Sequence, residues 1–259
     1  MKCLFKSIVC LQIITSSCML FSCSTANVEQ KEEQIRIESP VSSSDNDSVV
    51  NSIQGNVSLS QILTTPNAVV LTGLSDHRLI TVYKSKSNAN NYKSSDYSDE
   101  DESDKAEHFM PGIDILYGYN LLNIAHYDLK TEKLNFLFNH PALIKTLYYP
   151  SFIQDSINNK PINRDYYLVS AYDEDTNKDT LINRKDLRRF YHIDANNTIK
   201  TQLVPADYSV IRSQYDSRND IMYLFASHDA NKNGTRDLKE PIHVFWMNLK
   251  APLQAKRMY

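Results

Sequence analysis

The chain has 259 residues, of which 41% are hydrophobic and 23% charged, and this is enough for a core of ordinary size in one or two domains. Only 5 glycines occur, and none are spaced as a phosphate-cradling or dinucleotide-binding loop requires, which excludes nucleotide-dependent enzymes of those types. The formal net charge is −3 and no basic stripe is present, so we expect no nucleic-acid partner.

The N-terminus has the pattern of an export signal. Lys2 and Lys6 form a short basic region, and residues 7–21 are apolar but too few to span a bilayer comfortably. The 4 cysteines of the chain, at positions 3, 10, 18 and 23, all lie in or just after this segment. We therefore predict a signal peptide over residues 1–22.

The end of the signal, Leu20-Phe21-Ser22-Cys23, resembles the lipobox of bacterial lipoproteins. The resemblance implies a diacylglycerol on the Cys23 sulfur, cleavage before Cys23 and acylation of the new N-terminus, which together make a permanent membrane anchor. The residue after the cysteine is Ser24 and not the aspartate that retains lipoproteins in the inner membrane, so the outer membrane of a bacterial envelope is favoured. The domain could lie on either the periplasmic or the outer face of that membrane. The alternatives are a secretory signal cut nearby and an uncleaved anchor.

Two segments are too polar to build a core. Residues 23–57 are rich in Ser, Asn, Gln, Asp and Glu and lack aromatic residues, which predicts a disordered tether between the lipid and the domain. Residues 84–110 contain the run Asp96-Tyr97-Ser98-Asp99-Glu100-Asp101-Glu102-Ser103-Asp104, typical of a solvated acidic loop. The folded domain is expected over residues 58–259.

The domain is predicted to be all-β. Short runs rich in Tyr, Phe, Ile, Val and Leu alternate with Asn, Asp and Pro, and no long amphipathic helix interrupts them. The expected strands cover residues 68–74, 78–83, 121–129, 134–138, 144–149, 166–172, 189–193, 199–204, 210–215, 221–227 and 243–249.

An internal repeat refines this fold class. Residues 167–173 and 190–194 form a strand–loop–strand unit that residues 223–229 and 244–248 repeat, and residues 78–83 and 123–129 form a degenerate third unit around the acidic loop. A regular repeat of this size signals a repeat architecture. Residues 149–152, 166–170, 191–197 and 200–203 resemble blades of a TolB-type β-propeller.

The resemblance implies a β-propeller-like array of about three to four four-stranded blades, closed or open. Residues 253–259 could return as a missing strand of the first blade. Two chains could also combine, as a homo-oligomer. A β-sandwich made of the same hairpins is the alternative.

Two connections in the repeat resemble the calcium loop of EF-hands and dockerins. Calcium takes six to eight oxygen ligands, and alternate residues of a tight loop aim their side chains inward while the seventh supplies a backbone carbonyl. The expected ligands are Asp175, Asn177, Asp179, Leu181, Asn183 and Asp186 in the first loop, and Asp229, Asn231, Asn233, Thr235, Asp237 and Glu240 in the second.

The second loop is predicted to bind calcium more strongly. It has Gly234 at the sharp turn and a glutamate long enough to bind through both oxygens. The first loop has Thr180 at the turn and Asp186 at the end, which predicts a strained turn or a water-bridged last ligand. The alternative is that both loops are ordinary Asx turns.

These features favour a lipid-anchored, calcium-binding envelope or surface protein that acts as a binding module for a protein or glycan partner. The alternatives are a hydrolase of glycans or peptides on the same scaffold and a structural subunit of an envelope complex. The 7 histidines include no His-Glu-x-x-His pair, and there is no Gly-x-Ser-x-Gly motif, so we assign no catalytic residue. His126 and His192 occupy similar strand positions and are expected to be packed or rim residues.

Overall fold

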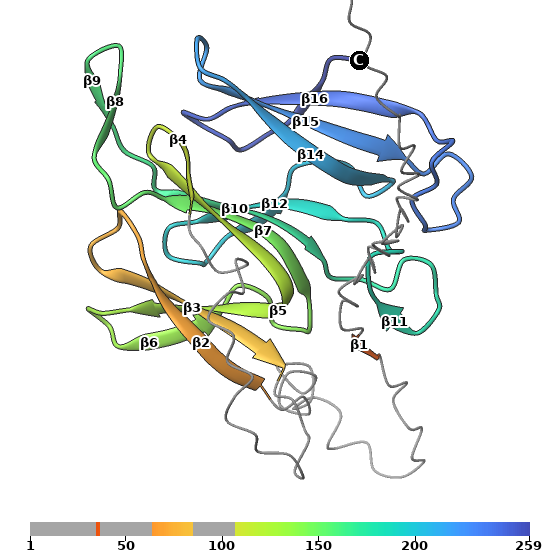
Figure 1. The fold of residues 1–259 in the computed structure, drawn as a ribbon, viewed down its shortest axis with the longest axis horizontal. Helices are drawn as coiled ribbons and strands as arrows, with labels where there is room; N and C mark the ends of the chain where they lie inside the picture. The colour runs from red at the N-terminus through yellow and green to blue at the C-terminus, as the bar shows by residue number, and fades with distance from the viewer. Residues whose placement is uncertain (1–34, 37–63, 85–106) are drawn as a thin grey trace, which may run out of the picture. The chain divides into compact units, whose positions relative to one another are not determined.

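A computed structural model describes residues 35–36, 64–84 and 107–259, all within one compact unit, Glu32–Tyr259. The signal peptide, Cys23, the tether and most of the acidic loop lie outside the described residues. The described chain is all-β, and its strands are antiparallel (Figure 1). The predicted fold class is therefore confirmed at this level.

The strands form three consecutive meanders. The first comprises β2 (Thr64–Leu71), β3 (His77–Lys84), β5 (Ile113–Asp128) and β6 (Lys133–Phe136). The second comprises β7 (Leu143–Pro150), β10 (Tyr166–Tyr172), β12 (Arg189–Asp194) and β13 (Lys200–Gln202). The third comprises β14 (Tyr208–Asp216), β15 (Ile221–His228), β16 (Ile242–Asn248) and β17 (Lys256–Arg257).

Each expected hairpin of the repeat is the central pair of one meander. These pairs are β3–β5, β10–β12 and β15–β16, and their connections are the acidic loop and the two Asp/Asn loops. Sequence reasoning thus placed the three equivalent connections correctly. It misplaced the C-terminus, because Lys256–Arg257 pairs with β16 of the third meander and not with the first.

The long strand β5 joins the first two meanders into a 9-stranded sheet. Its first half pairs with β7 and with β4 (Glu107–Met110), and its second half pairs with β3 and β6. The register shifts between Tyr117 and Leu121, where Gly118 lies so close to β7 that a Cβ would come within 2.2 Å of the Ile144 carbonyl oxygen. The predicted strand at 121–129 was therefore too short, and the acidic loop ends before β4.

The remaining strands are short. β8 (Asp155–Ile157) and β9 (Lys160–Ile162) form a hairpin, and its two turn residues, Asn158 and Asn159, have φ values of 52° and 61°. Two successive positive φ values are typical of the type I′ hairpin turn, which asparagine tolerates. β1 (Ile35–Arg36) pairs with β11 (Leu181–Ile182), which lies inside the first Asp/Asn loop.

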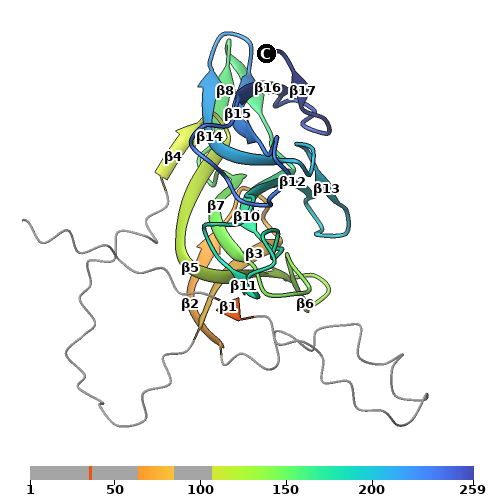
Figure 2. The ribbon, with the colours of Figure 1, turned by 90° about the vertical axis from the view of Figure 1, so that its right-hand side faces the viewer.

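The second meander is buried on both faces, so its strands read as continuous apolar runs instead of alternating ones. In β10, Tyr166 and Leu168 face the third meander, while Tyr167 and Val169 face the first. The three meanders therefore stack as layers, with one hydrophobic core on each side of the middle layer (Figures 1 and 2).

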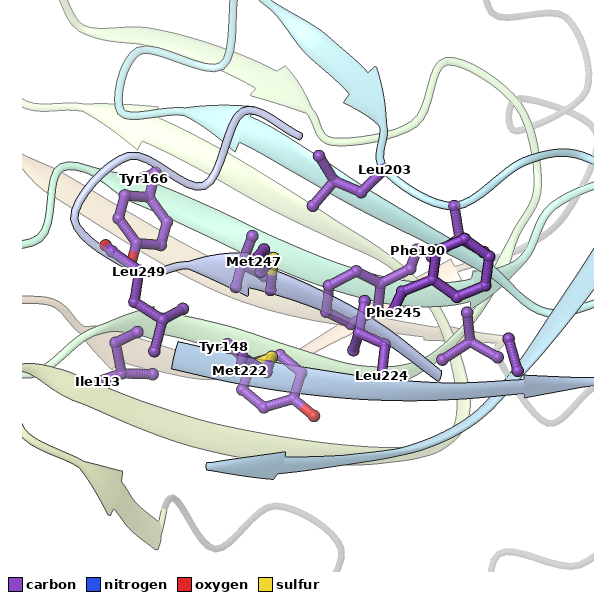
Figure 3. Close-up of a cluster of buried hydrophobic side chains, with 14 of the residues drawn as sticks. Ile113, Tyr148, Tyr166, Phe190, Leu203, Met222, Leu224, Phe245, Met247 and Leu249 are labelled. Carbon is purple, nitrogen blue, oxygen red and sulfur yellow. The ribbon is translucent and has the colours of Figure 1, made fainter. Parts of the chain in front are cut away.

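The core between the second and third meanders is drawn in Figure 3. Tyr148 and Phe190 of the middle layer meet Leu224 and Phe245 of the third, and all four are at most 5% exposed. Each buried side chain of this size stabilises the fold by about 1.5–3 kcal/mol relative to leaving it in water. This contact fixes the third meander, which carries the second Asp/Asn loop, against the second, which carries the first loop.

Candidate functional site

The two Asp/Asn loops connect equivalent strands of successive meanders. The first follows β10 and the second follows β15 (Figure 1). Asp229 directly follows the last residue of β15, whereas Asp173 and Glu174 separate the end of β10 from Asp175. Loop positions are counted from Asp175 in the first loop and from Asp229 in the second.

The second loop is closed by its first aspartate. The carboxylate of Asp229, which is 6% exposed, accepts hydrogen bonds from the backbone N–H groups of Asn233 (3.1 Å) and Gly234 (3.0 Å). The Asn231 side-chain oxygen also accepts from Asn233 N (2.9 Å), and the Asn233 side-chain oxygen accepts from Thr235 N (2.8 Å). These bonds wrap the backbone around the alternate polar side chains.

The first loop repeats the same bonds at the same positions. Asp175 accepts from the N–H groups of Asp179 (3.1 Å) and Thr180 (2.9 Å), and Asn177 accepts from Asp179 N (3.0 Å). Asp179 in turn accepts from Leu181 N (3.0 Å). The two loops thus share one backbone design, although only part of their sequence is identical.

The backbone conformation is also repeated. Positions four and six of each loop have positive φ, at Lys178 (60°) and Thr180 (70°) in the first and at Lys232 (58°) and Gly234 (72°) in the second. A β-branched residue is rarely found in this region because its Cβ approaches the backbone too closely. The strained turn expected at Thr180 is present.

The polar side chains of the second loop converge. The amide nitrogens of Asn231 and Asn233 both donate to the same oxygen of Asp237, at 2.9 and 3.0 Å. Positions three, five and nine therefore meet at one point. The side-chain oxygens of both asparagines accept the backbone bonds from Asn233 N and Thr235 N, so these amides would have to move before their oxygens could bind a calcium ion at that point.

The last residue of the second loop, Glu240, has one carboxylate oxygen without a hydrogen-bond donor among the described residues. Oε2 of Glu240 accepts a hydrogen bond from Asp237 N (3.1 Å), whereas Oε1 is buried and has no hydrogen-bond partner among the described residues. A buried carboxylate oxygen without a donor is costly unless a cation or water satisfies it. Glu240 therefore has a buried carboxylate oxygen that a cation or a water molecule could satisfy.

The last residue of the first loop has a different role. Asp186 is fully buried, and its carboxylate accepts from the backbone N–H groups of Thr176 (2.8 Å), Asn177 (3.3 Å) and Asn183 (2.8 Å). Burial raises the pKa of this carboxyl group, while these hydrogen bonds act in the opposite direction. Asp186 organises the loop backbone, so the first loop fits a cation less well than the second.

The two loops touch, which sequence reasoning did not predict. The hydroxyl of Thr176, in the first loop, donates to the carbonyl oxygen of Gly234 in the second (2.5 Å), and it accepts from Leu187 N (2.9 Å). A Cβ on Gly234 would lie 1.9 Å from the Thr176 carbonyl oxygen. Gly234 is thus required both by its φ and by the neighbouring loop.

The remaining predicted ligands are Leu181, Thr235 and Asn183. Leu181 and Thr235 occupy the seventh positions, where a backbone carbonyl is expected to bind, and Asn183 uses its side-chain oxygen to accept from Lys185 N (2.8 Å). Over the described ranges there is no group of three or more His, Cys, Asp or Glu side chains that could hold a metal ion. Any cation in these loops would accordingly depend on asparagine and backbone oxygens as well as on carboxylates.

A buried ion pair near the opposite end of the middle layer was also not predicted. Arg164 lies just before β10, and Asp220 lies in the turn between β14 and β15; their side chains are 2% and 3% exposed. Isolated charged residues in turns give no sequence signal of this pairing.

The two histidines expected to be packed or rim residues, His126 and His192, are 2% and 6% exposed.

The chain was compared with known proteins, and neither a family model nor a curated protein sequence matches it. Within the described ranges, no helix is both long and apolar enough to cross a membrane.

Proposed function

We propose that this chain is a lipid-anchored, calcium-stabilised binding module of the bacterial envelope. The observation that carries the proposal is the shared design of the two loops: the same hydrogen bonds, the same positive φ positions and a direct contact between them. If the loops were only Asx turns, the same bonds and φ values would not need to recur at equivalent places of the repeat.

In this proposal the second loop is the principal site. Asp229, Asn231, Asn233 and Asp237 would supply side-chain oxygens, Thr235 a carbonyl oxygen, and Glu240 one or both carboxylate oxygens. Bound calcium would stiffen the connection between β15 and β16 and, through Thr176 and Gly234, the adjacent loop. Its effect is stability, because the strands that flank the loop have no helix pair to open.

The three stacked meanders support a propeller-like array of three blades, with no further meander among the described residues. Each meander contains the four strands of one blade, and the loops of the repeat occupy equivalent positions in successive meanders. Over the described residues neither of the two large sheets closes into a barrel. A β-sandwich of the same hairpins stays the alternative; the burial of both faces of the middle meander supports an array of three layers.

Calcium binding is tested by calorimetric titration of the full chain in detergent, with the melting temperature measured in parallel. Glu240→Gln should weaken calcium binding more than Asp186→Asn, because Glu240 has an oxygen without a donor and Asp186 does not. At a hundredfold excess over the dissociation constant, calcium should stabilise the fold by about 2.7 kcal/mol per site. Magnesium should do less, since it demands near-octahedral geometry.

A matched control is Asp128→Asn. Asp128 also caps a turn, by accepting from Lys130 N (2.8 Å) and from the Thr131 hydroxyl (2.8 Å), but it is the last residue of β5 and lies outside the two Asp/Asn loops. Its substitution should change stability equally with and without calcium. If millimolar calcium produces neither heat nor a shift in melting temperature, the loops are ordinary Asx connections.

The anchor is tested separately. Mass spectrometry should find an acylated N-terminal Cys23, and Cys23→Ala should release the protein from membranes. A mature terminus elsewhere without lipid would refute this part of the proposal.

A further inference from the structure

The outer face of the third meander carries an aromatic surface that the core does not use. Along β15 and β16 the side chains alternate between the two faces of the sheet. Met222 and Leu224 point into the core and are fully buried, whereas Tyr223 and Phe225 are only half-buried. In the same way Phe245 and Met247 are buried, while Trp246 between them is not.

The strand register brings these outward residues together. Tyr223 is directly opposite Trp246, and Trp246 is directly opposite Lys256 on β17, so the three side chains project side by side from one face. The Lys256 ammonium lies 5.8 Å from the Trp246 ring centroid. Beside them, the Arg212 guanidinium is stacked 3.5 Å from the ring centroid of Phe225. The surface therefore combines aromatic rings with two cations.

A hollow adjoins Trp246 at the edge of this surface. Its volume is about 370 Å³, within the lower part of the range of small-ligand sites, and it is lined by Trp246, Asn248, Ala251, Leu253, Gln254 and Lys256. The segment after β16 forms its far wall, where Leu253 is 64% exposed. The lining thus offers one aromatic platform, two side-chain amides and one ammonium group.

We propose that this hollow binds an acidic glycan, with a sugar ring stacked on Trp246. The apolar face of a pyranose ring packs on an indole, and side-chain amides such as those of Asn248 and Gln254 can both donate to and accept from sugar hydroxyls. The Asn248 side-chain oxygen accepts a hydrogen bond from Lys250 N (2.9 Å), so its amide nitrogen and the Gln254 amide are the groups that an apolar peptide would leave unpaired.

The charges on this face select an acidic sugar. A uronate carboxylate would pair with the Lys256 ammonium, and Arg212 extends the positive surface along the next strands. Asp216 is a negative charge on the same face, where its carboxylate accepts hydrogen bonds from Arg218 N (2.9 Å), the Asn219 side chain (2.8 Å) and the Tyr223 hydroxyl (3.4 Å). It does not line the hollow, where Lys256 is the charged residue. This inference deepens the proposed role as a binding module and rests on it.

The test uses the fact that Trp246 is the chain's 1 tryptophan, so its fluorescence reports on this hollow alone. The full chain in detergent is titrated with tetragalacturonate and with cellotetraose, a neutral glycan of the same length. Tetragalacturonate should change the fluorescence saturably, with a Kd below about 1 mM, and cellotetraose should bind at least about fivefold more weakly.

Variants separate stacking from charge, with calorimetry as the readout where Trp246 is replaced. Trp246→Ala should weaken tetragalacturonate binding at least about tenfold. Lys256→Gln should weaken it about fivefold while leaving cellotetraose binding unchanged. Leu238→Ala, at a 93% exposed residue in the second Asp/Asn loop, is the control and should change neither.

Failure to bind either glycan at about 10 mM would overturn the proposal, as would binding that Trp246→Ala leaves intact. Equal affinity for the two glycans, unaffected by Lys256→Gln, would overturn the assignment of an acidic sugar. Calcium titration of the same preparation keeps this result distinct from a failure of the calcium proposal.

Discussion

The guanidinium of Arg164 and the carboxylate of Asp220 form a bidentate ion pair, with N–O distances of 2.7 and 3.1 Å, between the second and third meanders. The same guanidinium donates to the carbonyl oxygens of Leu249 (2.8 Å) and Pro111 (3.3 Å). The hydroxyl of Tyr166 donates to Leu249 as well (2.7 Å). These bonds hold the third meander against the second in one arrangement.

Removing Arg164 should therefore be strongly destabilising. Arg164→Ala leaves the Asp220 carboxylate buried without its cation and should lower the free energy of unfolding by about 3–5 kcal/mol. Chemical denaturation of the full chain in detergent measures this. The control is Lys130→Ala, which breaks the exposed Lys130–Asp76 pair (2.6 Å) and should have little effect. A loss no larger than that of the control would contradict a structural role for Arg164.

Gly234→Ala should uncouple the two loops. The added Cβ meets the Thr176 carbonyl oxygen, and alanine is disfavoured at a φ of 72°, so we expect a loss of about 2–4 kcal/mol. Thermal unfolding with and without calcium measures it. Because the contact lies between the loops, the calcium-dependent part of the stability should fall too; a variant with unchanged melting temperature would show that the loops are not in contact.

Thr180→Gly should raise the free energy of unfolding, in contrast to Gly234→Ala. Thr180 has a φ of 70°, and glycine removes the Cβ that makes this conformation unfavourable, so a gain of about 1 kcal/mol is expected. Thr235→Gly is the matched control, because Thr235 does not have a positive φ, and it should be neutral or destabilising. Denaturation midpoints decide between these outcomes. If both variants lose stability equally, the turn at Thr180 is not strained.

Acidification should destabilise the domain through its buried histidines. Burial lowers the pKa of His126, and so does the neighbouring His77 ring, stacked at a centroid distance of 4.8 Å. Burial also lowers the pKa of His192. The unfolded chain takes up protons near the ordinary pKa of about 6.5, while the folded chain does so only at lower pH. Stability present above this pH is therefore lost as the pH falls below it.

This pH dependence can be assigned to a residue. The free energy of unfolding, measured at pH 7.5 and at pH 5.5, should fall less in His126→Phe than in the unmodified chain. Phenylalanine keeps an aromatic ring against Tyr167, which lies 5.9 Å from His126 between ring centroids. An identical pH dependence in the two proteins would exclude His126 as a contributor.

Much of the secondary structure could be predicted from the sequence because it depends on local patterns. Short runs of aromatic and branched aliphatic residues, separated by Asn, Asp and Pro, identified the long strands of the meanders, often within one to three residues of their ends. Short strand pairs such as β1 with β11 were not predicted, because a strand of two residues has no recognisable sequence pattern. The β8–β9 hairpin had a turn signal in Asn158 and Asn159, but its strands are only 3 residues each.

The two loops illustrate the division between what is local and what is not. The spacing of their Asp and Asn residues, the positive φ at the sixth position and the strain at Thr180 were determined by the sequence alone, because Asx bonds and φ preferences act over a few residues. The contact of Thr176 with Gly234 and the burial of Asp186 were decided only by the tertiary structure. They depend on how residues 58 positions apart are brought together when one layer packs on the next.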